Sequence, residues 1–393
     1  MSAVLIFAGT LLAAVLLSGV AERTVISTAV LFLLVGFLAG DGVSDLLVLR
    51  PEDPLVTRLA ELALFSVLFT DGMRVGARDL VSAWRLPGRA LLLGLPLTLL
   101  VTAAFAHFVA GLPWIASFLV GAVLSPTDPV FASALVGREE VPRRLRHLLN
   151  VESGINDGLV LPVVVVLLAV AGNSEVEYGA ILGELALGVV IGVVVPWIAL
   201  RLEHTRFFDL AASYEPLYAF AVGILVLALA SVTHANLFLA AFSAGITTVT
   251  VSPHFKEAFH RFGELLTELL KLAAILVFGA LISPSFLGEI SVGGYVFVLL
   301  ALVVARPAAL LVSFLGSSIG PREWIAAAWF GPKGFASVVY GLLILESGVA
   351  LSGEMFHLIT PVVVASILLH SSTDVLVARW FEDAEHVEPG QRT

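Results

Sequence analysis

The chain has 393 residues, of which 59% are apolar and only 13% are charged, and its formal net charge is −10. A soluble domain carries roughly a quarter charged residues, whereas here apolar runs of about 20 residues, long enough to cross a bilayer as helices, recur along the whole chain. The composition therefore excludes a soluble domain and predicts a polytopic α-helical membrane protein, and the lack of cysteine excludes disulfides and Cys-ligated metals.

The apolar runs divide the chain into thirteen predicted membrane spans. The first is expected to be a retained helix rather than a secretory signal, because no Lys or Arg precedes it. The spans are 3–20, 24–40, 57–73, 88–110, 113–136, 146–171, 178–200, 212–232, 236–250, 264–283, 293–316, 323–347 and 355–379.

The basic residues of the loops alternate between the two sides of the membrane. Sixteen of the 21 Lys and Arg residues follow odd-numbered spans, whereas the other side has Arg50 and Arg58 and an acidic loop with Glu175 and Glu177. By the positive-inside rule, the C-terminus is predicted to be cytoplasmic and the N-terminus to lie outside a cell (inner) membrane.

Two of the spans are interrupted by polar motifs that contain proline. The span 113–136 contains SPTDP at 125–129, and the span 323–347 contains GPKG at 331–334. Each proline removes a helical hydrogen bond and clashes with the preceding turn. Simple proline kinks are the alternative, because they are common in membrane helices.

The positions of these breaks predict a repeat. If residues 176–208 form a linker helix, residues 1–175 and 209–381 are two repeats of six helices, and the interrupted span is the fifth in each. A single linker helix inverts the second repeat, and broken helices at matching positions of inverted repeats indicate a secondary-transporter site near the bilayer midplane. We therefore predict an all-α fold of two inverted six-helix repeats with broken crossing helices, followed by a short cytoplasmic tail at 382–393.

Each break also carries a charge, Asp128 in the first and Lys333 in the second. Two unwound helices that meet in the membrane bring half-helix ends together, and each end carries roughly half an elementary charge. Asp128 is expected to neutralise the positive ends and Lys333 the negative ends, which favours crossing helices over simple kinks.

The sixth span contains the polar stretch VESGINDG at 151–158, which places carboxylates where lipid would otherwise be. Ser153 and Asp157 are four residues apart and share a helix face, whereas Glu152 lies about 140° around the helix from Asp157. Arg306, a guanidinium deep in the eleventh span, is the expected partner of Glu152, because an unpaired buried carboxylate takes up a proton.

Asp157 has no evident partner in the sequence, although a structural salt bridge is the alternative. A desolvated carboxylate binds a proton more readily than one in water, and it can hold either a proton or a small monovalent cation but not both. Thr127, Ser153 and Asp128 are expected to supply further oxygens to the ion. Because Asn156 is neutral, the site has one titratable carboxylate at this point, which predicts an exchange of one proton per cation.

Two other charged residues lie near the ends of spans. Asp71, at the cytoplasmic end of the span 57–73, is a candidate for the entrance to the site, and a solvated helix end is the alternative. Lys271 lies within a turn of Glu268, and we interpret it as part of an interfacial pair or as a side chain that reaches the membrane surface, with a functional role as the alternative. The segment 254–262 is expected to lie at the cytoplasmic interface.

These motifs resemble those of the monovalent cation:proton antiporter-1 family, the NhaP-like and NHE-like sodium/proton antiporters, over essentially the whole chain. The resemblance implies that Asp157 binds both the monovalent cation and the proton, and that Glu152 and Arg306 form a structural ion pair. The residues that the resemblance assigns to the site and the crossover are Thr127, Asp128, Ser153 and Lys333.

The resemblance also bears on stoichiometry and assembly. The Asn156-Asp157 pair is similar to the electroneutral branch, because electrogenic relatives carry Asp-Asp there. Family members are homodimers in which a six-helix core domain moves as an elevator against a dimerisation domain. The chain departs from the family in GPKG at 331–334, where many members have GLRG, and at Asp71, where members vary between Asp and Glu, so the choice of ion stays open.

The sequence thus predicts a secondary transporter that exchanges a monovalent cation for H⁺, with Na⁺ as the expected ion and Li⁺ or K⁺ as alternatives. A cation channel or proton-leak pore, and an ion-coupled symporter of an organic anion, are the other hypotheses. The inverted repeats and the isolated carboxylate favour alternating access over a pore, and an anion site requires free basic groups, whereas Arg306 is expected to be paired. With no nucleophile–base set in the sequence, we expect no enzyme activity, no cofactor and no nucleic-acid partner.

Overall fold

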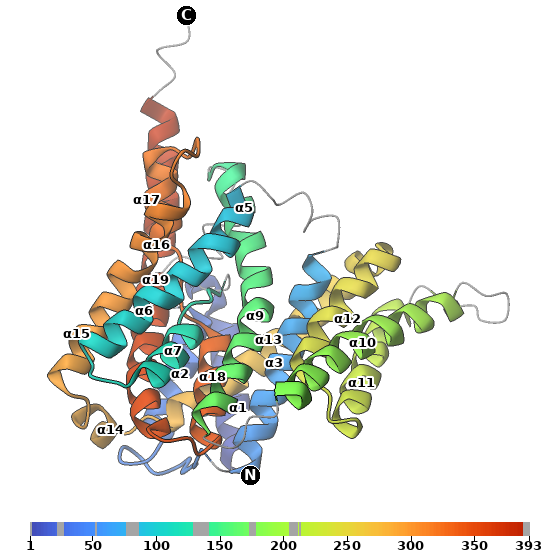
Figure 1. Cartoon of the computed structure of the whole chain (residues 1–393), viewed down its shortest axis with the longest axis horizontal. Coiled ribbons are helices and arrows are strands. Elements are labelled where there is room, and N and C mark those ends of the chain that lie inside the picture. The colour runs from blue at the N-terminus through green and yellow to red at the C-terminus, as the bar shows by residue number, and fades with distance from the viewer. Residues whose placement is uncertain are drawn as a thin grey trace, which may run out of the picture.

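The computed structural model describes residues 2–21, 27–51, 53–75, 86–128, 141–172, 178–203, 211 and 214–387, and within these ranges it contains helices and no strands (Figure 1). Each of the thirteen predicted spans contains a helix. The helices of the first half are α1 (Ser2–Ala21), α2 (Thr28–Ala39), α3 (Pro54–Arg74), α5 (Leu86–Arg89), α6 (Leu95–Phe108), α7 (Trp114–Val123), α9 (Arg143–Ala171) and α10 (Tyr178–Glu203).

The second half has the same all-helical character. Its helices are α11 (Glu215–Val232), α12 (Leu237–Val251), α13 (His254–Ala280), α14 (Pro284–Gly288), α15 (Val292–Leu300), α16 (Arg306–Ser313), α17 (Pro321–Trp329), α18 (Phe335–Glu346) and α19 (Ser352–Val387). Some predicted features lie outside the described residues, namely Pro129 and the rest of the fifth span, the loop with Glu175 and Glu177, and the last six residues of the tail.

The lengths of these helices fit a membrane protein that crosses the bilayer several times. Six continuous helical stretches among the described residues are long and apolar enough to cross a membrane, and five shorter helices are also apolar. The chain enters α1 at the bottom of Figure 1 and leaves α19 at the top, so its two ends lie on opposite sides, as an odd number of spans requires. Which side is cytoplasmic stays a prediction.

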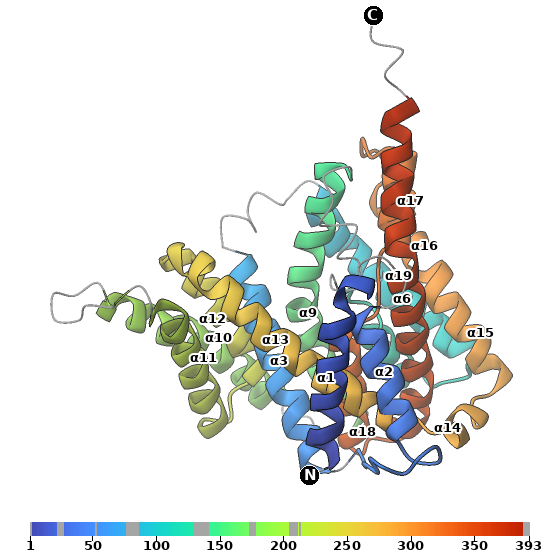
Figure 2. The same ribbon diagram turned by 180° about the vertical axis from the view of Figure 1, so that it is seen from behind.

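The helices form two groups that meet at the centre of the molecule. Helices α10, α11 and α12 lie at one side, whereas α6, α15, α16, α17 and α19 lie at the other, and α3, α9 and α13 run between them (Figures 1 and 2). Close packing of α3 on α12 depends on small residues, because a Cβ added to Gly72 or Gly245 would overlap the main chain of the other helix.

The fourth and eleventh spans share an irregularity that supports the inverted repeat. Each contains a π-helical turn, η1 (Ala90–Gly94) and η4 (Ala301–Ala305), and each turn comes just before a proline, Pro96 or Pro307. A proline has no N–H and crowds the carbonyl four residues earlier, and the wider turn accommodates it. The same distortion therefore occurs in the fourth span of both repeats, next to the interrupted fifth.

Two boundaries differ from the sequence prediction. The segment 254–262 is the first part of α13, which continues without interruption to Ala280. Helix α19 continues to Val387, so the predicted tail at 382–393 begins inside this helix.

Candidate ion-binding site

The two interrupted spans cross at the centre of the protein. After α7 the chain is non-helical through Asp128, and the residues between α17 and α18 are also non-helical. The main-chain N–H of Asp128 donates to the carbonyl oxygen of Pro332 at 2.9 Å, which joins the two breaks directly.

The charge in each break lies against a helix end of the opposite sign. Asp128 Oδ2 accepts a hydrogen bond of 3.0 Å from the N–H of Phe335, the first residue of α18. Lys333 Nζ is 3.4 Å from the carbonyl oxygens of both Ser125 and Pro126, which follow the C-terminus of α7. The carboxylate is thus at a positive half-helix end and the ammonium at a negative one, where each is stabilised.

The crossing leaves no room for side chains at two glycines. A Cβ on Gly334 would overlap the side chain of Asp128, and a Cβ on Gly331 would overlap that of Arg306. Glycine at these positions lets the main chain approach both charged groups closely. Neither the helix propensity nor the hydropathy of the span accounts for a glycine there.

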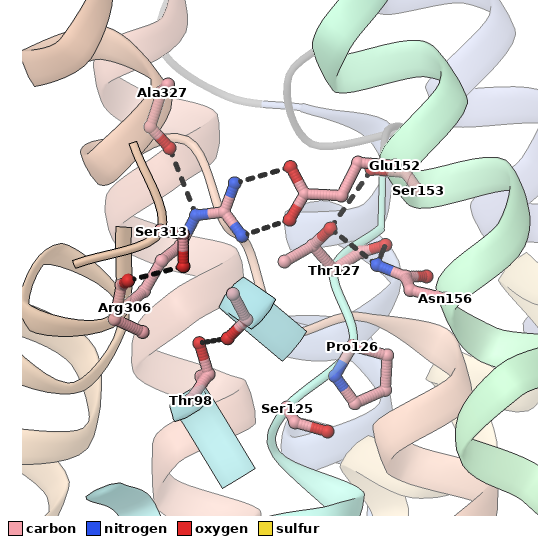
Figure 3. A network of polar contacts seen from close by, with 12 residues as sticks. Thr98, Ser125, Pro126, Thr127, Glu152, Ser153, Asn156, Arg306, Ser313 and Ala327 are labelled. Atoms are coloured by element: carbon pink, nitrogen blue, oxygen red, sulfur yellow. Dashed lines mark hydrogen bonds and ion pairs between the residues drawn. The ribbon is translucent and has the colours of Figure 1, made fainter. Parts of the chain in front are cut away.

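Glu152 and Arg306 form a bidentate ion pair beside the crossing (Figure 3). The two guanidinium nitrogens donate to the two carboxylate oxygens at 2.6 and 2.9 Å, and the side chains are nearly inaccessible, with Glu152 3% and Arg306 4% exposed. Arg306 Nε also donates to the carbonyl oxygen of Ala327 at the end of α17, at 3.0 Å. The ion pair thereby connects α9 to α16 and α17, and the opposite charges of Glu152 and Arg306 neutralise one another.

Three polar side chains connect α9 to the first break. Asn156 Nδ2 donates to Thr127 Oγ1 at 2.8 Å, and Thr127 Oγ1 lies 3.1 Å from Ser153 Oγ (Figure 3). All three side chains are buried. Their hydroxyl and amide oxygens are the kind of hard ligand that alkali cations take.

Asp157 lies one residue further along α9 and is only 5% exposed. Its main-chain carbonyl accepts a hydrogen bond from the Tyr340 hydroxyl at 2.9 Å. Its carboxylate oxygen Oδ1, like Oδ1 of Asn156, is buried and has no hydrogen-bond partner among the described residues. Because buried polar atoms are nearly always satisfied, the unsatisfied Oδ1 of Asp157 indicates a place for a bound ion or proton.

Four charged side chains lie close enough to Asp157 to interact with it electrostatically: Asp71, Asp128, Lys271 and Lys333. The predicted site residues are therefore brought together from α3, α9 and both breaks. Asp71 is buried, and its Oδ1 is 3.2 Å from Arg74 Nη1, so it is not the solvated helix end that the sequence left open.

The interpretation of Lys271 as an interfacial or surface-reaching side chain was wrong. Lys271 lies 17 residues into α13, is buried, and has its Nζ 3.9 Å from Asp128 Oδ1. Glu268, which lies one turn away in the sequence, was the expected partner of Lys271. Nothing in the local sequence indicates that α13 brings Lys271 to the crossing.

A cavity of about 550 Å³ leads from the surface to this group of charges. Its opening lies where α3 ends, on the side of the molecule on which α19 ends (Figure 1). It is lined by Thr70, Asp71, Arg74, Glu264, Leu265, Thr267, Glu268 and Lys271. At the other end of α3, a pocket of about 10 Å³ is lined by residues that include Thr57 and Glu346, which form a hydrogen bond of 3.1 Å. The larger cavity thus gives the charges of the site access to the side on which α3 ends.

The sequence analysis also missed the residues that hold the second break in place. The N–H of Lys333 donates to Ser366 Oγ at 2.6 Å, Ser366 Oγ lies 3.0 Å from His370 Nδ1, and His370 Nε2 lies 2.9 Å from the carbonyl oxygen of Trp329. These contacts attach α19 to both ends of the break. A main-chain carbonyl cannot be identified as a partner from the sequence, because every residue has one. The histidine within an apolar span, His370, was the one sequence signal of these contacts.

The fold is similar to a known one. The chain superimposes with a TM-score of 0.80 on the structure of the sodium proton antiporter MjNhaP1 from Methanocaldococcus jannaschii, with 18% sequence identity, over 96% of this chain and 99% of the other.

Two relatives show a similarity of sequence. The K(+)/H(+) antiporter NhaP2 of Shewanella sp. strain MR-4 is 27% identical over 386 residues, which cover 94% of this chain and 66% of that protein. The K(+)/H(+) antiporter NhaP of Alkalimonas amylolytica is 26% identical over 356 residues, which cover 89% of this chain and 62% of that protein. The chain thus spans less than two thirds of the length of these relatives. The family model described as sodium/hydrogen exchanger, transmembrane, matches residues 9–380, and the chain belongs to this family.

Proposed function

We propose that this protein exchanges a monovalent alkali cation for H⁺ across the membrane and that Asp157 binds either one. The observation that carries the proposal is the buried, unpartnered carboxylate oxygen of Asp157 beside the crossing of the two broken helices. A carboxylate in such a place is stable when it holds a proton or a cation, and it cannot hold both. Competition for one group couples the movement of the two ions.

The surrounding residues complete a cation site. Oδ1 of Asn156 is also without a hydrogen-bond partner among the described residues, whereas its Nδ2 donates to the Thr127 hydroxyl, which lies 3.1 Å from the Ser153 hydroxyl. Asp71 and Asp128 approach from α3 and the first break. In our proposal these oxygens replace part of the hydration shell of the cation, while Glu152 and Arg306 hold α9 in position without contacting the ion.

The asymmetric access to the site supports alternating access rather than a continuous pore. A cavity of about 550 Å³ reaches Asp71 and Lys271 from the side on which α3 ends, whereas the pocket lined by Thr57 and Glu346 near the start of α3 has a volume of only about 10 Å³. We propose that the helices carrying the crossing move as an elevator against the other group of helices. In this proposal the protein is a homodimer in the cell membrane, and the open cavity faces the cytoplasm.

Na⁺ and K⁺ are the two ions to compare. Na⁺ is the ion that the sequence analysis favours and the one named for the structural neighbour, whereas the two sequence relatives are named for K⁺. Because Asn156 is neutral, the site alternates between one bound proton and one bound cation. We therefore propose a 1:1, electroneutral exchange.

The proposal is tested in proteoliposomes that contain a pH-sensitive dye and an imposed pH gradient. Addition of Na⁺ or K⁺ should dissipate the gradient with the wild-type protein, and the Asp157→Asn variant should abolish this response while remaining folded. Asp41→Asn, which makes the same chemical change at an exposed turn, should exchange ions as the wild type does. Cation-dependent proton flux through Asp157→Asn would disprove the assignment of the binding residue.

A further inference from the structure

The buried lysine of α13 has a place in the site that the exchange mechanism above does not use. We propose that Lys271 is a tethered cation of the binding site, which competes with the transported cation for the carboxylates and thereby keeps the affinity for that cation low. This inference deepens the proposed function and rests on it.

Lys271 lies beside a carboxylate of the crossing. Its side chain is 6% exposed, and its Nζ is 3.9 Å from Asp128 Oδ1, within the range of an ion pair but longer than a hydrogen bond. Asp71 and Glu268 also lie within electrostatic range of this ammonium group. Lys271 therefore faces the carboxylates of the site and not the membrane surface.

Charged groups of both signs surround Asp157. Three carboxylates, Asp71, Asp128 and Asp157, share this region with the ammonium groups of Lys271 and Lys333. Arg74, 3.2 Å from Asp71, and Glu268 are further charged neighbours of this region. Removal of the Lys271 ammonium makes the region more negative by one charge, so its attraction for a cation becomes stronger.

The two lysines differ in what their ammonium groups contact. Lys333 Nζ donates to the carbonyl oxygens that follow α7, so its charge belongs to the crossover. Lys271 lines the cavity through which an ion arrives, at the end nearest the crossing. An ammonium is a compact monovalent cation on a flexible four-carbon stem, so Lys271 resembles the transported ion in charge and is able to move aside when that ion binds.

The contact also joins two separate parts of the protein. Helix α13 packs mainly on α2 and α3, whereas Asp128 is hydrogen-bonded to Pro332 in the second break and to Phe335, the first residue of α18. Any motion of the crossing past α13 separates Lys271 from Asp128. A cation that takes the place of the ammonium removes the attraction between these parts, so binding of the ion and release of the contact favour one another.

The test compares neutral and charged substitutions of Lys271 in the whole protein. Cation-dependent exchange is measured in proteoliposomes at an alkaline pH, where protons compete least, with K271M and K271Q as neutral variants and K271R as the charged one. Lys256→Met is the matched control, because Lys256 lies on the same helix but is exposed. We expect the KM for the cation to fall by about ten-fold or more in K271M and K271Q and to stay close to that of the wild type in K271R and K256M.

A second readout separates ion binding from turnover. The concentration of Na⁺ or K⁺ that raises the melting temperature of the purified protein half-maximally should fall in the neutral variants by a factor similar to that for the KM. A KM that is unchanged or higher in folded K271M, in a protein whose wild type exchanges ions, would overturn the inference alone. If K271R folded but K271M and K271Q did not, Lys271 would have a structural role, and the inference would also be overturned. A wild type that exchanges no cation would instead disprove the proposed function.

Discussion

The ion pair between Glu152 and Arg306 allows the most quantitative prediction of this account. Replacing Arg306 by Met keeps much of the side-chain volume but leaves the Glu152 carboxylate without the two hydrogen bonds of 2.6 and 2.9 Å that it now accepts. Removing one partner of a buried pair costs about 3–5 kcal/mol, because the other charge stays buried and unpaired. The lost bond from Arg306 Nε to the Ala327 carbonyl adds about 1 kcal/mol.

The assay is thermal unfolding of the purified protein in detergent. A loss of this size should lower the melting temperature by roughly 10 °C. The double variant Glu152→Leu, Arg306→Met removes both charges and should recover most of the loss, because an apolar pair of similar volume is about as stable as the ion pair.

A surface pair of the same protein provides the control. Arg58 Nη1 is 3.1 Å from Glu61 Oε2, but the Arg58 side chain is 77% exposed, and such pairs contribute about 0–1 kcal/mol. Arg58→Met should therefore melt close to the wild type. If Arg306→Met melted at the same temperature as Arg58→Met, the buried pair would not have the structural role that we assign to it.

Three further substitutions test the crossing and its surroundings. Gly334→Ala should lower both the melting temperature and the rate of exchange, because its Cβ overlaps the Asp128 side chain, whereas Gly353→Ala, with no atom within 4 Å of its Cβ, should have little effect. Thr127→Val removes the hydroxyl that contacts Asn156 and Ser153 and should raise the KM for the cation by about ten-fold without unfolding the protein; an unchanged KM would exclude Thr127 from the site. His370→Leu should destabilise the protein by about 1–3 kcal/mol, as measured by thermal unfolding, because the Trp329 carbonyl and Ser366 lose their buried partner, and a stability equal to that of the wild type would show that these contacts contribute little.

The parts of the fold that could be predicted are those in which lipid makes a residue costly. Proline and a charged residue in the middle of an apolar run have few explanations in a membrane, so the two breaks, with Asp128 and Lys333, indicated crossing helices and an inverted repeat. The structure shows the two breaks in direct contact, and the comparison with a solved structure bears out the all-α fold, whereas the division into two repeats stays a prediction. The same reasoning suggested Arg306 as the partner of Glu152, because few other basic groups lie deep in a span.

The parts that could not be predicted depend on contacts between distant helices. Lys271 had a neighbouring carboxylate one turn away, and the sequence does not show that α13 begins at His254 and brings residue 271 to the crossing. The contacts of His370 include a main-chain carbonyl, which every residue has. The two π-helical turns had a proline as their one local signal, and a proline inside a helix also causes simple kinks, so the type of distortion could not be predicted.

The central claim, that one carboxylate carries either a proton or a cation, is tested most directly by the charge moved in each cycle. Proteoliposomes with a fixed pH gradient would be given Na⁺ or K⁺ while the membrane potential is either clamped at zero or set to a negative or a positive value. We predict that the cation dissipates the pH gradient at the same rate and to the same end point at every potential, because each cycle exchanges one positive charge for another. An end point that moves with the potential would show unequal exchange and would contradict the single-carboxylate mechanism at Asp157.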